Sequence, residues 1–200
     1  MATRRLAVVT AGISQPSSSR LLADRLASAT VDALATRGID TQVSVIEVRE
    51  LARDLVDQLL TGFPSPRLRA AIETLTGADG IIAVSPIFSA SYSGLFKTFF
   101  DVLGEDALAG KPVLLGATAG TARHSLALDH ALRPLFAHLR AVAVPTGVLA
   151  AADDWGDQCL ATRIERAGGE LADLVASRAA AAPADPFADV VPFEALLRRG

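Results

Sequence analysis

The stretch ADGIIAVSPIFSASYSGLFK, residues 78–97, decides the fold, because a strand, a loop and a helix start follow one another in it. The run GIIAV, residues 80–84, is apolar throughout, as expected of a strand that helices cover on both faces. We expect Pro86 to end this strand and Ser93-Gly94 to open the next helix. The intervening residues are uncharged and rich in serine.

Four more short apolar runs separate segments with helical spacing along the chain. The strands are expected at 6–10, 41–48, 80–84, 112–118 and 141–149. Helical spacing relates Leu22 to Leu26, Ala29 and Ala33; Leu68 to Ile72 and Leu75; Leu95 to Phe99 and Val102; and Leu128 to Leu132, Leu135 and Leu139. Strands alternating with helices require crossovers, so we expect a doubly wound five-stranded parallel sheet in a three-layer α/β sandwich.

The ends of the chain complete this organisation. The run 41–48 alternates in part, which is typical of an edge strand. A last amphipathic helix is expected over about 157–181, so that residues 1–182 form one domain. The tail, residues 183–200, contains three prolines that forbid a long helix. It is either a free end or an arm packed on another subunit.

Composition narrows the function classes. Half of the 200 residues are hydrophobic, a fifth are charged, and the net charge is −3, so a nucleic-acid partner is not expected. No stretch is long and apolar enough to span a membrane, and we expect an unprocessed, soluble chain. The single cysteine, Cys159, favours a reducing compartment such as the cytoplasm. The three histidines lack metal-ligand spacing, so no metal site is expected.

The loop after the first strand, AGISQPSSSRLL at 11–22, favours an anion site. Ser14, Ser17, Ser18 and Ser19 stand at the start of a helix, whose first N–H groups have no partner within the helix. Arg20, a cation in the first turn, opposes the helix dipole and is better tolerated beside an anion. A simpler interpretation is that these serines only cap the helix. The loop contains neither a dinucleotide fingerprint nor a P-loop.

Two further loops follow strands whose carboxyl ends meet at the same edge of the sheet. The loop at 85–93 carries Phe88 and Tyr92 among small residues, which suits a flat heterocycle; alternatively, both aromatic rings fold into the core. GATAGTARH, residues 116–124, again places small residues ahead of a helix. One loop suited to phosphate and two suited to a ring together describe FMN.

Nearly the whole chain resembles the flavodoxin-like NAD(P)H-dependent FMN reductases, and most of all the reductase components of two-component alkanesulfonate monooxygenase systems. The most specific match is the string P-x-[YF]-x-x-x-Y-S-G-x-x-K-x-x-x-D at Pro86–Asp101. AGISQPSSSRLL, DDWG and the tail DVVPFEALL also match. Lys97 and Asp101 belong to the string, and their spacing also suits an i,i+4 ion pair.

The resemblance implies a flavin site position by position. Ser14, Ser17, Ser18, Ser19 and Arg20 would hold the FMN phosphate; Pro86, Ile87, Phe88, Ser89, Tyr92, Ser93 and Gly94 would line the isoalloxazine; and Thr118, Ala119, Gly120 and Thr121 would approach its other edge. It also implies a homodimer or homotetramer, NADH or NADPH as co-substrate, and a flavin-dependent monooxygenase as partner.

The chain departs from these relatives at two positions. Ser18 stands where they often carry an arginine, and His130 stands where they often carry a tyrosine inside a π-helical bulge at a subunit interface. Pro134 has no N–H to donate to the His130 carbonyl, so we expect a local helix distortion whatever the side chain. His130 is otherwise an ordinary interface or core histidine, and His124 and His138 are expected on helix surfaces.

The leading functional interpretation is an NAD(P)H:FMN oxidoreductase that passes reduced FMN to a separate monooxygenase. Hydride transfer to a flavin needs no protein acid or base, so no catalytic residue is assigned. One alternative enzyme keeps FMN bound and reduces a quinone, an azo compound or a metal oxyanion. A different class is a non-enzymatic flavodoxin-type electron carrier, against which the mild net charge counts. A flavin-binding sensor module is the weakest alternative.

Overall fold

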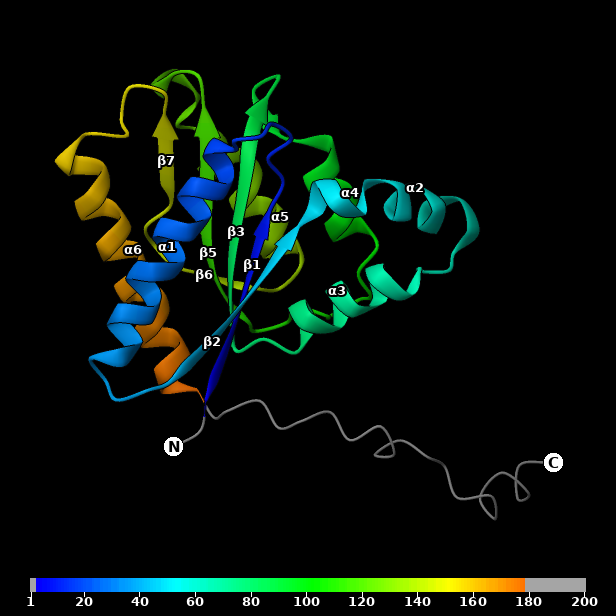
Figure 1. Ribbon diagram of the computed structural model, residues 1–200, viewed down its shortest axis with the longest axis horizontal. Coiled ribbons are helices and arrows are strands. Elements are labelled where there is room, and N and C mark those ends of the chain that lie inside the picture. The colour runs from blue at the N-terminus through cyan, green and yellow to red at the C-terminus, as the bar shows by residue number, and fades with distance from the viewer. Residues whose placement is uncertain (1–2, 179–200) are drawn as a thin grey trace, which may run out of the picture.

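The structure, a computed structural model, describes residues 3–178 and is built on one parallel sheet (Figure 1). The expected tail at 183–200 and the last residues of the helix expected at 157–181 lie outside the described residues. The sheet contains β1 (Arg4–Thr10), β2 (Thr41–Glu47), β3 (Gly80–Phe88), β5 (Pro112–Ala119), β6 (Val142–Ala143) and β7 (Val148–Ala151). The strand order is β2-β1-β3-β5-β6, and β7 also pairs with β5. Each of these pairings is parallel, which confirms the doubly wound flavodoxin-like topology.

Helices cover both faces of the sheet (Figure 1). Two long helices, α1 (Ser18–Ala35) and α6 (Gln158–Ser177), pack on one face. The other face carries η1 (Val48–Leu51), α2 (Ala52–Thr61), α3 (Pro66–Thr76), α4 (Gly94–Asp101), the π-helix η3 (Leu128–Leu132) and α5 (Arg133–His138). A short η2 (Ala122–His124) follows β5. The expected three-layer sandwich is therefore confirmed.

Successive residues of the central strands pack alternately into the two hydrophobic cores, one on each face of the sheet. In β1, Leu6 and Val8 belong to the cluster under α1 and α6, whereas Ala7 and Val9 belong to the opposite cluster. Both faces are buried, which explains why the sequence of this strand is apolar without alternation. β2 is the edge strand that its partial alternation predicts, and its Val43 remains 38% exposed.

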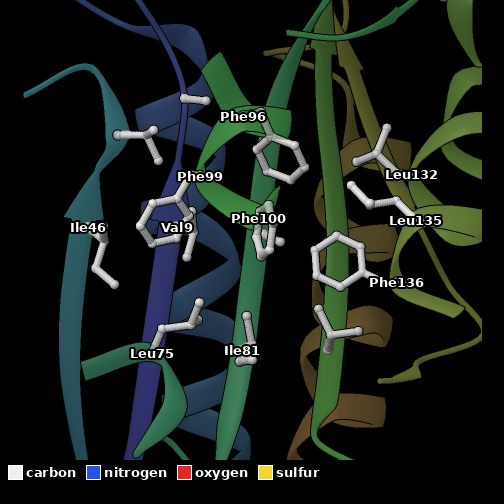
Figure 2. Close-up of a cluster of buried hydrophobic side chains, with 14 of the residues drawn as sticks. Val9, Ile46, Leu75, Ile81, Phe96, Phe99, Phe100, Leu132, Leu135 and Phe136 are labelled. Carbon is white, nitrogen blue, oxygen red and sulfur yellow. The ribbon is translucent and has the colours of Figure 1, made fainter. Parts of the chain in front are cut away.

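Aromatic side chains fill the core beside α4 and α5 (Figure 2). The ring of Phe100 lies between Phe96 and Phe136, with centroid distances of 4.8 and 4.9 Å. All three rings are buried, and their tilted or edge-on contacts are the favourable arrangements for aromatic pairs. This cluster fixes α4, and with it the loop that precedes α4, against the sheet. The expected i,i+4 ion pair between Lys97 and Asp101 forms on the exposed side of α4.

On the opposite face, α1 and α6 approach each other closely. A Cβ added at Gly168 would lie 2.9 Å from the carbonyl carbon of Ala29 and 2.9 Å from the backbone nitrogen of Thr30. Such distances are too short for any side chain, so glycine at this crossing lets the two backbones touch.

Three details differ from the expectations or extend them. The strand expected to end at Pro86 continues to Phe88, because its ladder with β1 ends at Val84 while Pro86 still pairs with β5 and the last two residues pair with the short strand that follows. On the side that β1 no longer covers, a missing N–H costs nothing. The strand expected at 141–149 is two short strands, β6 and β7, because Pro145 interrupts it. The helix α2 was not among the expected elements; Leu55 is its only residue buried in the core.

The expected distortion ahead of Pro134 is confirmed. The chain forms a π-helix over Leu128–Leu132, with His130 at its centre, and continues as α5 from Arg133. The extra residue in the turn accommodates a position that has no N–H to donate. His130 is exposed, as are His138 and the neighbouring surface of the π-helix at Asp129.

An antiparallel hairpin of β3 with β4 (Ser91–Tyr92) projects at the end of β3. Its two-residue turn, Ser89-Ala90, has φ angles of +49° and +66°. A type I′ turn requires this left-handed backbone at both positions and normally uses Asn-Gly there. The present residues therefore carry strain.

Ala90→Gly should remove part of this strain and raise the free energy of unfolding by about 1 kcal/mol. Urea denaturation measures the difference. Ala70→Gly, on the exposed side of α3, is the matched control and should lower stability by about 1 kcal/mol. Equal losses at the two positions would contradict the strain assigned to the turn.

Candidate functional site

The loops after β1, β3 and β5 meet in one cavity of about 560 Å³ at the carboxyl ends of these strands. We call it the flavin cavity, after the FMN that the sequence leads us to expect there. It is lined by Gly12, Ile13, Ser14, Ser17, Ser18, Ser19, Pro86, Ile87, Phe88, Thr118, Ala119, Gly120, Ala150, Ala152 and Trp155. Open parallel sheets bind ligands at the carboxyl ends of the strands, at the point where the strand order reverses. In this sheet that point lies between β1 and β3.

The start of α1 forms one end of the flavin cavity. Ser17 caps the helix, and its Oγ accepts a hydrogen bond of 3.2 Å from the backbone N–H of Arg20. The hydroxyls of Ser19 and Thr118 are 2.7 Å apart and buried, so they join this loop to the end of β5. The remaining first-turn N–H groups have no partner within the helix and suit an anion.

Gly12 is required for this arrangement. A Cβ at this position would lie 1.9 Å from the Oγ of Ser17 and 3.2 Å from the Cβ of Ser19. The loop therefore passes so close to the helix start that only glycine leaves the cap intact.

A network of charges supports the loop from the side of β2. The Arg20 guanidinium donates Nε to Asp24 at 2.8 Å and Nη1 to Glu47 at 2.5 Å. Glu47 is also 2.8 Å from Nη2 of Arg49, whose Nη1 donates to the carbonyl of Ser14 at 3.2 Å. Hydrogen bonding and charge interaction with Asp24, and then with Glu47, raise the pKa of Arg20 against a lowering by burial. Arg20 is thus a fixed cation whose Nη2 has no partner among residues 3–178.

The hairpin of β3 and β4 forms the other end. Ser85 is buried at its base, where its Oγ donates to the carbonyl of Pro86 and accepts from the N–H of Ser93, both at 2.9 Å. Ser93 in turn caps α4 through the N–H of Phe96. Phe88 lines the cavity and stays 48% exposed, which leaves an apolar face open to a ligand.

Ten of the sixteen residues expected at the site line this cavity. They are Ser14, Ser17, Ser18, Ser19, Pro86, Ile87, Phe88, Thr118, Ala119 and Gly120. Six others lie nearby in the chain but do not line it: Arg20, Ser89, Tyr92, Ser93, Gly94 and Thr121. Arg20 is turned to two carboxylates, Tyr92 contacts the ring of Phe96 at 6.0 Å, and Ser93 is buried as a helix cap.

Five lining residues were not expected: Gly12, Ile13, Ala150, Ala152 and Trp155. The last three belong to the end of β7 and the turn after it, beyond the end of the strand expected at 141–149. The sequence could have indicated these residues, because Trp155 lies in the DDWG segment and every parallel strand ends at the same edge of the sheet. Trp155 is held by the guanidinium of Arg25, 5.4 Å from the ring centroid.

Two other features are absent from residues 3–178. No group of three or more histidine, cysteine, aspartate or glutamate side chains there is placed to hold a metal ion. No helix in the same part of the chain is long and apolar enough to cross a membrane.

The fold and the cavity together define a class: an α/β protein of flavodoxin type with a nucleotide-sized site at the carboxyl edge of its sheet. The chain belongs to the NADPH-dependent FMN reductase family, which it matches over residues 4–156.

Particular relatives agree with this placement. The FMN reductase (NADPH) of Pseudomonas aeruginosa is 35% identical over 179 residues, which cover 87% of this chain and 94% of the relative. The NADH-dependent FMN reductase SfnE of Pseudomonas putida is 38% identical, over 65% of this chain and 73% of the relative. A solved oxidoreductase structure from Corynebacterium diphtheriae is 47% identical with a TM-score of 0.87, covering 88% of this chain and 99% of that one.

The residues present fit FMN. The site volume lies in the usual range for small-molecule cavities. Serine hydroxyls and helix N–H groups at one end are donors for a phosphate, and Gly12 lets the loop pass directly against these serines. The uncharged surface of Ile87 and Phe88 at the other end suits a flat ring.

Gly12→Ala should displace Ser17 from its capping position and lower the free energy of unfolding by about 1 kcal/mol or more, as measured by urea denaturation. Gly12→Ala combined with Ser17→Gly should recover most of this loss, because glycine is an acceptable N-cap residue. Gly156→Ala, with nothing within 4 Å of the added Cβ, is the control. A single variant as stable as this control would refute the close approach.

Proposed function

We propose that the protein is an NAD(P)H:FMN oxidoreductase that holds FMN in the flavin cavity and delivers reduced FMN to a separate flavin-dependent monooxygenase. The observation that carries this is the cavity itself, with anion donors at one end and an uncharged aromatic surface at the other, in a member of the FMN reductase family. The monooxygenase partner is suggested by the resemblance to reductase components of two-component systems.

The phosphate end is formed by α1. Ser17 and Ser18 present hydroxyl groups to a bound phosphate, together with the first N–H groups of the helix, while the Ser19 hydroxyl is hydrogen-bonded to Thr118. Arg20 stands behind them as a cation held in place by Asp24 and Glu47, with Nη2 left as a donor. Charge-assisted hydrogen bonds of this kind are stronger than neutral ones.

The ring end positions the flavin. When bound, FMN supplies the chemistry, because its N5 accepts a hydride from the nicotinamide without help from a protein acid or base. Pro86, Ile87 and Phe88 offer a surface for the ring, and the loop from Thr118 to Gly120 faces it from the neighbouring strand. The chain therefore contributes orientation and hydrogen bonds.

Flavin affinity should be moderate. The lining of the ring end carries no charged side chain among the described residues, so the phosphate end supplies the strong contacts. A reductase that feeds a separate oxygenase must release its product, which moderate affinity and an open site permit. His130 replaces the tyrosine associated in relatives with flavin as a substrate, and this tilts the balance slightly toward partly retained flavin.

Rapid mixing of the purified protein with NADPH, and separately with NADH, in the presence of excess FMN tests the proposal. At least one nucleotide should bleach the flavin absorbance well above the uncatalysed rate, with multiple turnovers of free FMN. If neither nucleotide does so, the protein is an electron carrier. Reduction of bound flavin alone, without turnover of free FMN, identifies instead an enzyme that keeps FMN as a prosthetic group.

Arg20→Ala should weaken FMN binding by about tenfold or more while riboflavin binding changes little, because only FMN carries the phosphate. Titration of flavin fluorescence measures both affinities. Arg69→Ala, an exposed arginine of α3 far along the chain from the site, is the control. Equal losses for both flavins would remove the phosphate assignment.

The protein should form a homodimer or homotetramer in the cytoplasm. The support comes from an exposed apolar surface along α2 and the loop after it, where Val56, Leu59, Leu60 and Phe63 are 53% to 80% exposed. The apolar residues of α4, by contrast, mostly serve the chain's own core. Light scattering should give a mass of at least twice 20.8 kDa at micromolar concentration, and Leu60→Lys should reduce it. A monomeric wild-type protein would contradict this, and truncation at Ala182 tests the tail separately.

A further inference from the structure

A second cavity, of about 600 Å³, lies between the π-helix η3, the outer strand β7 and helix α6. We call it the edge groove. Its lining includes Leu126, Pro145 and Leu149, which are apolar, and Arg163 and Arg166, which are charged. Nothing in the proposed handling of FMN uses it. A cavity of this size with an apolar wall and convergent polar groups is typical of a ligand site.

Two arginines give the edge groove its charge. Arg163 and Arg166 are three residues apart on α6, so both point from the same side of the helix. Within residues 3–178, neither side chain takes part in an ion pair or hydrogen bond. Glu165 lies between them and does not line the groove, as expected for a residue on another side of the helix.

The acidic groups around the groove are already engaged. Asp129 is paired with Nε of Arg133 at 3.1 Å. Glu170 accepts hydrogen bonds from the N–H and the hydroxyl of Thr146, at 2.8 and 2.7 Å. Asp157 caps α6 through the N–H of Cys159. The positive charge of the two arginines is therefore available to an anion from solution.

A smaller cavity of about 240 Å³ adjoins the edge groove, and residues next in sequence to its lining residues Leu149 and Asp154 line the flavin cavity. This smaller cavity shares Ser125, Leu149, Cys159 and Arg163 with the groove. It also contains Ala122, two residues after the Gly120 that lines the flavin cavity. A long ligand seated at the flavin therefore has a path over the end of β7 to the arginines.

We propose that the edge groove binds the adenosine end of the nicotinamide dinucleotide, with Arg163 and Arg166 contacting its phosphate oxygens. This rests on the proposed function, which requires a pyridine nucleotide whose nicotinamide reaches the flavin. A guanidinium matches phosphate geometry and keeps its charge, and an arginine near the ribose is a known means of accepting the 2′-phosphate of NADP. The apolar wall at Leu126 and Pro145 suits the adenine ring.

Direct binding tests the proposal without any flavin reduction. Calorimetric titration of the full chain with adenosine 2′,5′-bisphosphate, ADP and adenosine should show binding of a phosphorylated probe. Arg163→Ala combined with Arg166→Ala should weaken that binding at least tenfold and leave adenosine unaffected. Arg69→Ala, also an exposed arginine, should change nothing. Thermal unfolding of each variant establishes that it is folded.

The phosphorylated probes distinguish whether the arginines contact the 2′-phosphate or the pyrophosphate. Loss confined to the bisphosphate assigns the arginines to the 2′-phosphate and predicts a raised KM for NADPH, with KM for NADH and both kcat values unchanged. Equal loss for ADP assigns them to the pyrophosphate and predicts raised KM values for both nucleotides. No binding of either phosphorylated probe to the wild-type protein, or equal binding by the double variant, overturns the proposal. FMN turnover is measured separately, so its failure would refute the proposed function alone.

Discussion

The parallel hydrogen-bond ladder of β1, β3 and β5 is the constraint on which the rest of the structure depends. It pairs Thr10 with Val84 and Pro86 with Thr118, so the chain leaves these three strands within one layer of the sheet. The serine loop, the hairpin and the Thr118 loop consequently meet without long-range side-chain contacts to bring them together. The buried contact between Ser19 and Thr118 then locks two of these loops to each other.

The two faces of the sheet support this edge in different ways. On one face, the aromatic rings of Phe96, Phe100 and Phe136 hold α4, whose cap, Ser93, is bonded back to Ser85 at the base of the hairpin. On the other face, α1 carries the serines on its first turn while its buried side packs on the sheet and on α6. The hairpin and the serines at the start of α1 therefore rest on separate cores.

Much of this could be predicted from sequence, for physical reasons that differ between elements. The central strands were readable because burial on both faces leaves an unbroken apolar run, as in GIIAV. The helix start in the serine-rich loop was predictable because serine is a common N-cap residue, and Ser17 does cap α1. The end of β3 was placed too early because Pro86 breaks a strand only where its N–H is needed, and pairing partners are not visible locally.

Other features depend on contacts that no local pattern contains. Helix α2 places most of its apolar residues toward solvent, so its periodicity does not indicate a buried face. The ion pair of Arg20 with Glu47 depends on β2, which is distant in sequence, whereas its pair with Asp24 has the local i,i+4 spacing. The distortion at Leu128–Leu132 was predictable because it follows from the covalent structure of Pro134 alone. Three segments that are distant in sequence line the edge groove, and nothing in the sequence indicated it except isolated arginines.

The contact at Gly168 makes α1 and α6 a rigid pair, because backbone atoms touch and no flexible side chain separates the helices. Ser17–Ser19 stand on one member of the pair, and Arg163 and Arg166 lie on the other, the latter only two residues from the crossing. The pair therefore sets the distance between the two proposed anion-binding sites. This distance is set by helix packing, so substitutions in the surface loops leave it unchanged. A single methyl group at residue 168 would push the two helices apart and change it.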